Sequence, residues 1–242
     1  MKNIKVFDSE ISHPYIDVVK KSFENCLEYK SQLPSFILEL EGMSGKKYRH
    51  FINNVIGSIS DARYLEIGSW KGSTLCSAIF NNDVVAYAID DWSTDGGPKT
   101  EFNRNIENCI EKSDNDLEIN VHFEENDYSK VDYSEIGKYN VFFYDGAHEE
   151  EHQYQGIVLA SQSLDDVFVL IVDDWNWADP KNGTNKAITD LNLEILYSVE
   201  IDSTEDYNSG AVFQNSDWHN GYFISVVKKT KTNNTKNKKQ KS

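Results

Sequence analysis

The sequence predicts a doubly wound α/β fold, in which helices cover both faces of a mostly parallel sheet. Short runs rich in β-branched and aromatic residues alternate with amphipathic or polar helical stretches, which is the pattern of βαβ units. Five of these runs are almost continuously apolar, as expected for strands that are covered on both faces. The chain has 242 residues, 39% of them hydrophobic, which is sufficient for one large domain.

The expected strands can be placed in chain order. Five parallel strands are predicted at residues 63–67, 84–89, 118–123, 139–144 and 166–172, and a closing antiparallel pair at residues 193–201 and 221–229. The segment between the last two runs contains Gly and Asn and has little helical character. The sequence therefore predicts a seven-stranded, mostly parallel sheet with an antiparallel closing strand.

Two helices are expected before the sheet. Residues 14–31 and 44–59 have apolar residues at helical spacing, and Pro34 separates them. We expect residues 1–60 to form a helical N-terminal extension or lid. Residues 61–228 would form the α/β domain, and residues 229–242 a disordered Lys-rich tail.

Charge argues against a nucleic-acid partner. The net charge is −16, and the last 15 residues contribute seven Lys and no acid. The preceding body therefore has 17 basic and 40 acidic residues, a balance of −23, which repels phosphate backbones and anionic membranes. A nucleic-acid or partner contact through the tail is the alternative, but the tail lacks the interleaved aromatic residues that stack on bases.

The remaining composition is typical of a cytoplasmic protein. No apolar run approaches the roughly 20 residues of a membrane span, and the first residues contain no apolar signal-peptide core. Cys26, Cys76 and Cys109 lack metal-site spacing and are interpreted as ordinary thiols of a reducing compartment. A homo-oligomer remains possible.

Acidic residues follow all five predicted parallel strands. They are Glu66 in the first strand, Asp90 and Asp91, Asp127, Asp145, and Asp173 with Asp174. One such strand end is ordinary, because Asp is a good turn residue. Ligands of open α/β sheets bind beyond the carboxyl ends of the strands, so five acidic ends on one edge indicate a functional site.

The turn after the first strand contains two glycines. Gly68 would let a ligand approach the backbone, and Gly72 with Ser73 would begin a helix whose amides favour an anionic group. A tight strand–helix turn explains the glycines equally well. Asp90 lies about 20 residues further on, where an acid accepts ribose hydroxyls; Asp91 is the alternative for that role, or only a cap. Together they suggest an adenosine-bearing ligand.

These motifs resemble class I S-adenosylmethionine-dependent methyltransferases, whose fold is Rossmann-like. The segments "LEIGSWKGST" (65–74) and "YAIDDW" (87–92) look like the family's first two motifs. "YDGAH" (144–148) and "IVDDWNW" (171–177) resemble metal-dependent macrocin- and rhamnosyl-type sugar O-methyltransferases, and more distantly catechol O-methyltransferase. The resemblance implies S-adenosylmethionine as cofactor, with these candidate contacts: Glu66, Gly68, Gly72, Ser73, Asp90, Asp91, Asp127, Tyr128 and Asp145.

Three of the acidic residues form a candidate metal site. Asp145, Asp173 and Asp174 follow adjacent strands, and oxygen ligands without clustered Cys or His favour Mg²⁺, with Mn²⁺ as an alternative. A metal there would lower the pKa of a substrate hydroxyl. The alternative is that these residues only cap turns.

His148 is the candidate general base. It follows Asp145 by three residues, and in macrocin-type enzymes the His of D-G-x-H is assigned the role of proton acceptor. The alternative is a hydrogen-bonding residue at a helix start, in which case Asp145 is the next candidate catalytic group. His152 is expected at the surface or at the substrate rim, and Trp175 and Trp177 either against a sugar ring or in plain packing.

The function expected from these residues is metal-dependent O-methylation of a sugar, glycan or glycosylated metabolite. The alternatives are a catechol-like phenol as acceptor, a metal-dependent hydroxylase or hydrolase, and a non-catalytic module that only binds S-adenosylmethionine. The last would bind the cofactor without turnover.

Overall fold

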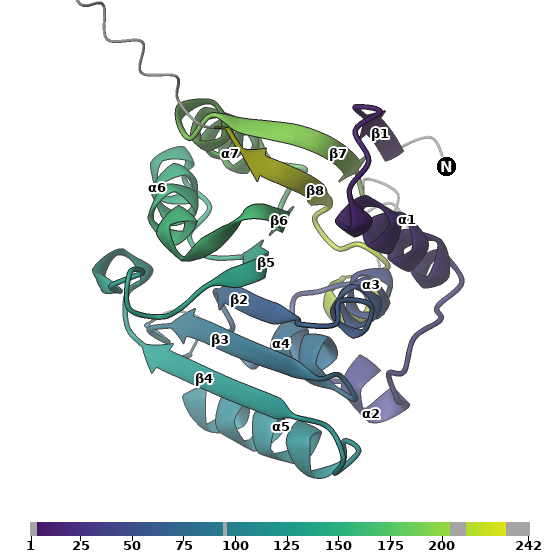
Figure 1. The fold of residues 1–242 in the computed structure, drawn as a ribbon. Coiled ribbons are helices and arrows are strands. Elements are labelled where there is room, and N and C mark those ends of the chain that lie inside the picture. Colours follow the sequence, from purple (N-terminus) through teal and green to yellow (C-terminus); the bar gives the residue numbers. More distant parts are fainter. Residues whose placement is uncertain (1–3, 94–95, 204–211, 231–242) are drawn as a thin grey trace, which may run out of the picture.

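A computed structural model describes residues 4–93, 96–203 and 212–230 of the chain. All eight strands of this part form one sheet in the order β1-β7-β8-β6-β5-β2-β3-β4 (Figure 1). The strands are β1 (Ile4–Asp8), β2 (Arg63–Ile67), β3 (Val84–Asp90), β4 (Ile119–Glu125), β5 (Tyr139–Tyr144), β6 (Leu164–Val172), β7 (Leu193–Ile201) and β8 (Tyr222–Lys229).

Strand direction follows the prediction. β4, β3, β2, β5 and β6 are parallel to one another, and β8 inserts antiparallel between β6 and β7. The mostly parallel α/β fold with an antiparallel closing strand is thus confirmed. The eighth strand, β1, pairs antiparallel with β7 at the sheet edge and was not predicted. Val6 and Phe7 of β1 are both largely exposed, so this strand has no buried face to give an apolar alternation.

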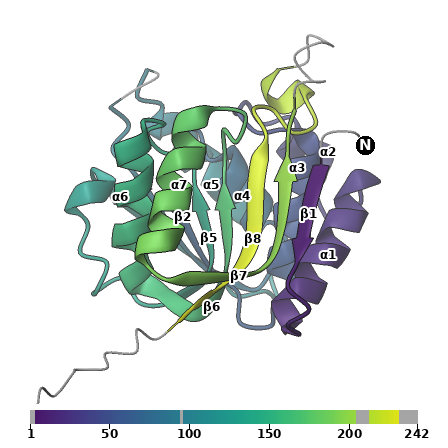
Figure 2. The same cartoon turned by 90° about the horizontal axis from the view of Figure 1, so that it is seen from above.

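Helices cover both faces of the sheet (Figures 1 and 2). One face carries α1 (Pro14–Leu27), α2 (Ser35–Leu38), α3 (Lys46–Gly57), α4 (Ser73–Ile79) and α5 (Lys99–Glu111), and the other carries α6 (Glu150–Ala160) and α7 (Ala178–Asp190). Short 3₁₀ turns are η1 (Tyr128–Lys130), η2 (Ser161–Ser163) and η3 (Phe213–Asn215).

The pleat of β5 distributes its side chains between two cores. Val141 and Phe143 belong to the core beneath α1 to α5, whereas Phe142 and Tyr144 belong to the core beneath α6 and α7. All four are fully buried, which explains why this strand has no polar alternation. The sheet is therefore covered on both sides at its centre.

The N-terminal segment is part of the same packing. Helices α1 and α3 lie within the predicted helical ranges, residues 14–31 and 44–59, and end a few residues short of them. Tyr48 and Phe51 of α3 are completely buried in the first core. At the other terminus, Lys229 ends β8, and residues 231–242 of the predicted tail lie outside the described residues.

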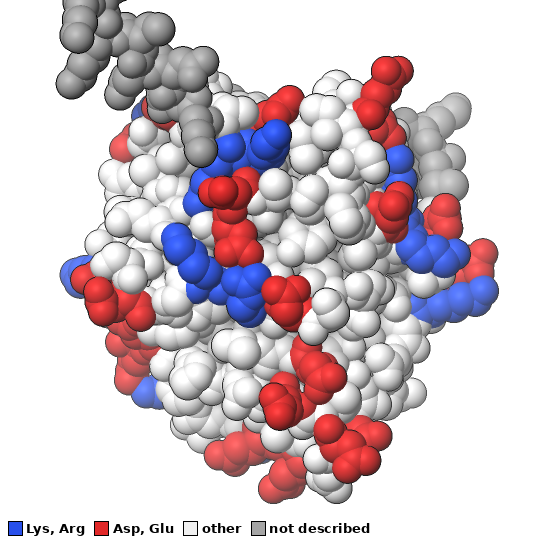
Figure 3. Space-filling view, in the orientation of Figure 1, with Lys and Arg blue, Asp and Glu red and all other residues white. Residues whose placement is uncertain are grey.

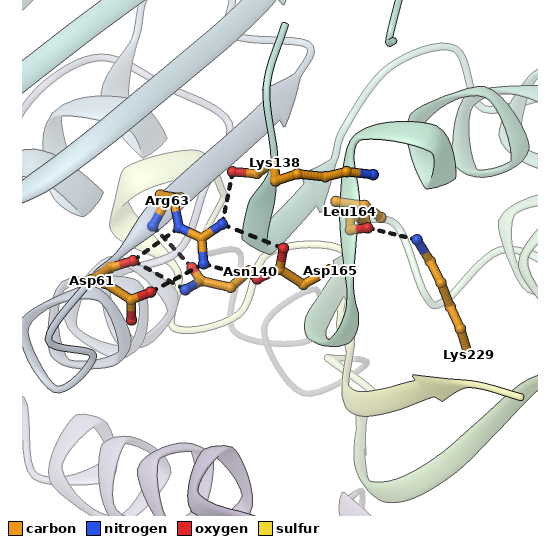
Figure 4. A network of polar contacts seen from close by, with 7 residues as sticks. All are labelled: Asp61, Arg63, Lys138, Asn140, Leu164, Asp165 and Lys229. Atoms are coloured by element: carbon orange, nitrogen blue, oxygen red, sulfur yellow. Dashed lines mark hydrogen bonds and ion pairs between the residues drawn. The ribbon is translucent and has the colours of Figure 1, made fainter.

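Charged residues at the amino ends of the strands form a structural network (Figure 4). The Arg63 guanidinium donates to Asp165 at 2.8 Å, to Asp61 at 3.1 Å and to the Lys138 carbonyl at 3.0 Å. Asn140 joins it by donating to the Asp61 carbonyl at 3.1 Å. These contacts tie the beginnings of β2, β5 and β6 together, at the end of the sheet opposite to the five acidic strand ends.

Candidate functional site

A cavity of about 1020 Å³ opens at the carboxyl ends of the parallel strands. Its walls come from the residues that follow β2, β3, β4 and β5, together with the beginnings of α6 and α7. After β2 the chain proceeds outward to β3 and β4, and after β5 in the opposite direction to β6. The cavity therefore lies at the switch point where open α/β sheets bind ligands.

The two glycines of the first turn have different roles. Gly68 has φ +87° and lines the cavity, and a Cβ there would lie 1.9 Å from the Asp145 carbonyl oxygen. A glycine is therefore required at position 68, because the ends of β2 and β5 approach each other closely there. Gly72, with φ +78°, precedes α4 and faces the Phe102 ring. Ser73 is buried, and its hydroxyl oxygen lies 3.4 Å from that of Ser44. Neither Gly72 nor Ser73 lines the cavity.

Asp90 organises the wall of the cavity. One carboxylate oxygen accepts from the amides of Ser69 and Trp70, both at 2.8 Å, and the other accepts from the amide of Trp92 at 2.7 Å. Asp90 thus uses three hydrogen bonds to hold the turns after β2 and β3. Asp91 also lines the cavity, and among the described residues its exposed carboxylate accepts hydrogen bonds only from Ser93. The geometry makes Asp91 the better placed of the two for an incoming ligand.

The residues after β4 form the next part of the wall. Asp127 caps η1 by accepting from the Ser129 amide at 2.9 Å, and this contact lowers the pKa of the carboxyl. The Tyr128 hydroxyl is hydrogen-bonded to Nδ1 of His152 at 2.8 Å, which joins η1 to α6. Burial, reinforced by nearby carboxylates, raises the pKa of Tyr128 to about 12, so its hydroxyl keeps its proton. Asp127, Tyr128 and His152 all line the cavity.

His148 and Asp174 form a pair at the ends of β5 and β6. Nδ1 of His148 lies 2.9 Å from Oδ2 of Asp174, and Asn220 donates to the other oxygen of the same carboxylate. The His148 side chain is 46% exposed and lines the cavity, whereas that of Asp174 is 6% exposed. The His148 and Trp177 rings pack in a T-shaped contact, with ring centroids 5.2 Å apart. The carboxylate thus fixes the orientation of an imidazole on the cavity wall.

The three candidate metal ligands share a strongly acidic environment. Burial, followed by repulsion from Asp173 and Asp174, raises the pKa of the Asp145 carboxyl well above its usual range. Burial and Asp174 act in the same direction on Asp173, whose carboxylate accepts from the Asp174 amide at 2.8 Å. Asp145 lines the cavity, whereas Asp173 and Asp174 lie behind it. Within the described residues, no three Asp, Glu, His or Cys side chains converge into a ready-made metal site.

Glu66 lies beneath the cavity and does not line it. It is completely buried and accepts from the Tyr64 hydroxyl at 2.6 Å, and burial raises the pKa of its carboxyl to about 7. Among the described residues, its second oxygen and the buried hydroxyls of Tyr48 and Tyr222 have no hydrogen-bond partner. These two rings stack with centroids 4.2 Å apart. Sequence reasoning missed this polar layer because its members come from α3, β2 and β8.

The aromatic side chains after β6 have separate roles. Trp175 is buried against Phe223, at a centroid distance of 4.6 Å, and is therefore a packing residue. Trp177 is 42% exposed and lines the cavity. Met43 and Trp70, which the sequence did not single out, line it as well.

No protein-family model and no curated protein matches the sequence. Solved structures do share its fold. An O-methyltransferase from Bacillus cereus in complex with SAH (S-adenosylhomocysteine) superposes with a TM-score of 0.54 at 12% identity, covering 86% of this chain and 91% of that one. The cofactor-bound protein Rv0187 from MTB superposes with a TM-score of 0.51 at 13% identity, covering 90% of this chain and 92% of that one. YjhP from E. coli gives 0.52 at 13% identity, covering 87% and 100%.

Proposed function

We propose that the protein is a class I S-adenosylmethionine-dependent O-methyltransferase. The observation that carries the proposal is the His148–Asp174 pair on the wall of a large cavity at the switch point of the sheet. A base oriented by a carboxylate is what removal of a hydroxyl proton requires. The likeness of the fold to an O-methyltransferase that binds SAH agrees with this assignment.

The lining of the cavity suits the proposed cofactor. It contains six Asp or Glu residues, and among the described lining residues there is no Lys or Arg. Such a surface attracts a sulfonium and repels a polyphosphate. Asp91 would accept the ribose hydroxyls, Gly68 would allow close approach of the ligand, and Tyr128 would lie by the adenine. When bound, S-adenosylmethionine supplies a methyl group on a positively charged sulfur.

The chain's own residues would act on the acceptor. The hydroxyl proton would pass to Nε2 of His148 as the acceptor oxygen takes the methyl group, and the cofactor's sulfur would leave as a neutral thioether. Asp174, on Nδ1, holds the ring in place and stabilises the imidazolium. Trp177, next to His148, offers a flat face to a sugar ring. A sugar or glycan hydroxyl is therefore the proposed acceptor.

A divalent metal is the finer part of this proposal. A cation held by Asp145, Asp173 and Asp174, Mg²⁺ or Mn²⁺, would relieve the repulsion that raises the pKa of Asp145 and Asp173, although within the described residues the three side chains do not converge on one point. Bound metal would supply positive charge that stabilises a developing alkoxide. We expect activity to stop with excess chelator and to return with Mg²⁺ or Mn²⁺. Full activity in chelator would assign the three acids to structural roles.

Transfer of a labelled methyl group from S-adenosylmethionine to a panel of sugars and phenols tests the function. We expect His148→Ala to lower kcat by about 10²–10⁴, since a general base contributes that factor. His148→Gln should not restore it, because an amide cannot accept the proton. Wild-type protein that binds SAH but methylates no hydroxyl would support the non-catalytic alternative. Turnover by His148→Ala within a few-fold of wild type would move the base to another residue.

A further inference from the structure

Apart from Asp145, a candidate metal ligand, and Asp91, which accepts from Ser93, the acidic side chains of the cavity fall into two groups. Those in the first group already have partners. Asp90 accepts hydrogen bonds from three backbone amides. Asp127 accepts a hydrogen bond from the Ser129 amide, and its carboxylate lies 3.7 Å from the Lys130 ammonium. Glu149 and Asp179 form the second group. Within residues 4–93, 96–203 and 212–230, neither carboxylate makes a hydrogen bond or an ion pair. Glu149 is the N-cap residue of α6 but its side chain makes no capping hydrogen bond, and Asp179 lies in the first turn of α7.

Glu149 and Asp179 flank the proposed acceptor end of the cavity. Glu149 follows His148 directly in the chain, and Asp179 lies two residues after Trp177. The edge contact between His148 and Trp177 brings the two segments together, and α6 packs against α7. Both residues line the cavity, as does Trp177, whose ring is in contact with that of His148.

Lys181, two residues after Asp179, lies over the Trp175 ring at 5.8 Å and does not line the cavity. Two other lysines are paired with acidic side chains. Lys186 of α7 lies 3.2 Å from Glu151, and Lys71 lies 2.7 Å from Glu41 while packing over the Trp70 ring at 4.4 Å. Neither lysine lines the cavity. Figure 3 shows the same imbalance on one outer face, where acidic side chains gather along the lower margin, over β4 and α5. An anionic acceptor would thus meet carboxylates that have no ion-pair partner and, among the described lining residues, no cation.

We propose that the acceptor is a hydroxyl compound that carries a protonated amine, such as an amino sugar. This inference rests on the proposed function and names the substrate class of the same site. Glu149 and Asp179 attract the ammonium group, and Trp177 provides a face for a cation or for the sugar ring. The hydroxyl remains the group that reacts, at His148. The same charges select against phosphorylated and carboxylated acceptors.

The test compares three probes that differ in charge: glucosamine, N-acetylglucosamine and glucuronate. Their binding is titrated by ligand-observed NMR on full-length protein saturated with SAH, at a pH where the amine is protonated. Exposed carboxylates contribute about two- to five-fold each, so we expect affinity to fall from glucosamine to N-acetylglucosamine to glucuronate. The preference should shrink as salt is raised, because both carboxylates face solvent.

Isosteric variants identify the residues responsible. Glu149→Gln with Asp179→Asn should remove most of the preference for glucosamine, whereas Glu107→Gln, an exposed position on α5 outside the cavity, should keep it. Glucuronate binding as tightly as glucosamine, or an unchanged preference in the double variant, would overturn the inference. SAH binding is measured on the same samples by calorimetry. Its absence would count against the proposed function, whereas normal SAH binding without charge preference would count only against the amine.

Discussion

Replacing Asp174 by Asn separates two roles that one carboxylate can have. Asp174 lies 2.9 Å from Nδ1 of His148 and is 6% exposed, so its charge acts on the imidazole with little water between them. A hydrogen bond to a charged group contributes about 1.5–3 kcal/mol. Because His148 is 46% exposed, we take the lower half of that range. This corresponds to a loss of roughly 10- to 50-fold in kcat, since about 1.4 kcal/mol is a factor of ten.

The assay is methyl transfer under saturating cofactor, repeated with increasing Mg²⁺ and Mn²⁺. If Asp174 orients His148, added metal does not restore kcat, and SAH affinity is unchanged because no cofactor contact is assigned to Asp174. If Asp174 acts only as a metal ligand, high metal concentration restores the rate. Asp17→Asn removes the same charge from exposed α1 and serves as the control. Wild-type kcat in Asp174→Asn, with normal folding, would refute the role of the pair.

Three further outcomes follow from the contacts. Asp91→Ala should weaken SAH binding by about 1–3 kcal/mol in calorimetry without changing the free energy of unfolding. Asp90→Ala should instead lower the free energy of unfolding by at least about 2 kcal/mol, because three backbone amides lose their acceptor. The Glu66 carboxyl has a pKa raised from 4.5 to about 7, so its contribution favours folding below pH 4.5 and is lost as pH rises towards 7. Denaturant titrations should therefore show wild type losing up to about 3 kcal/mol relative to Glu66→Gln over that window, and a constant difference would contradict the burial argument. Asp165→Ala should lower the unfolding free energy by about 1–2 kcal/mol through its partly exposed pair with Arg63 and leave kcat unchanged; a large loss of activity would show that the network reaches the site.

The sequence predicted those features that depend on local periodicity. The central strands β2, β5 and β6 are recognisable because they are buried on both faces, as Val141 and Phe142 illustrate on β5, whereas the edge strand β4 has no buried residue. The edge strand β1 was not recognisable, because Val6 and Phe7 are both exposed and their pairing with β7 connects residues almost 200 positions apart. The cavity could be expected at the strand ends from topology alone.

Partners within the site were beyond sequence reasoning. Asp90 and Asp91 look equivalent in the chain, yet only the fold brings the amides of the first turn onto Asp90. The pairing of Asp174 with His148, and the contribution of Asn220 to it, join three separate loops. Such contacts depend on how strand ends meet in space, and no periodic pattern encodes them.

Calorimetric titration of the wild-type protein with SAH tests the central claim most directly. The account predicts saturable binding to one site per chain, and the same titration of Asp91→Ala should show the affinity reduced. No detectable binding at millimolar SAH, from protein whose cooperative unfolding shows it to be folded, would contradict the assignment of the cavity.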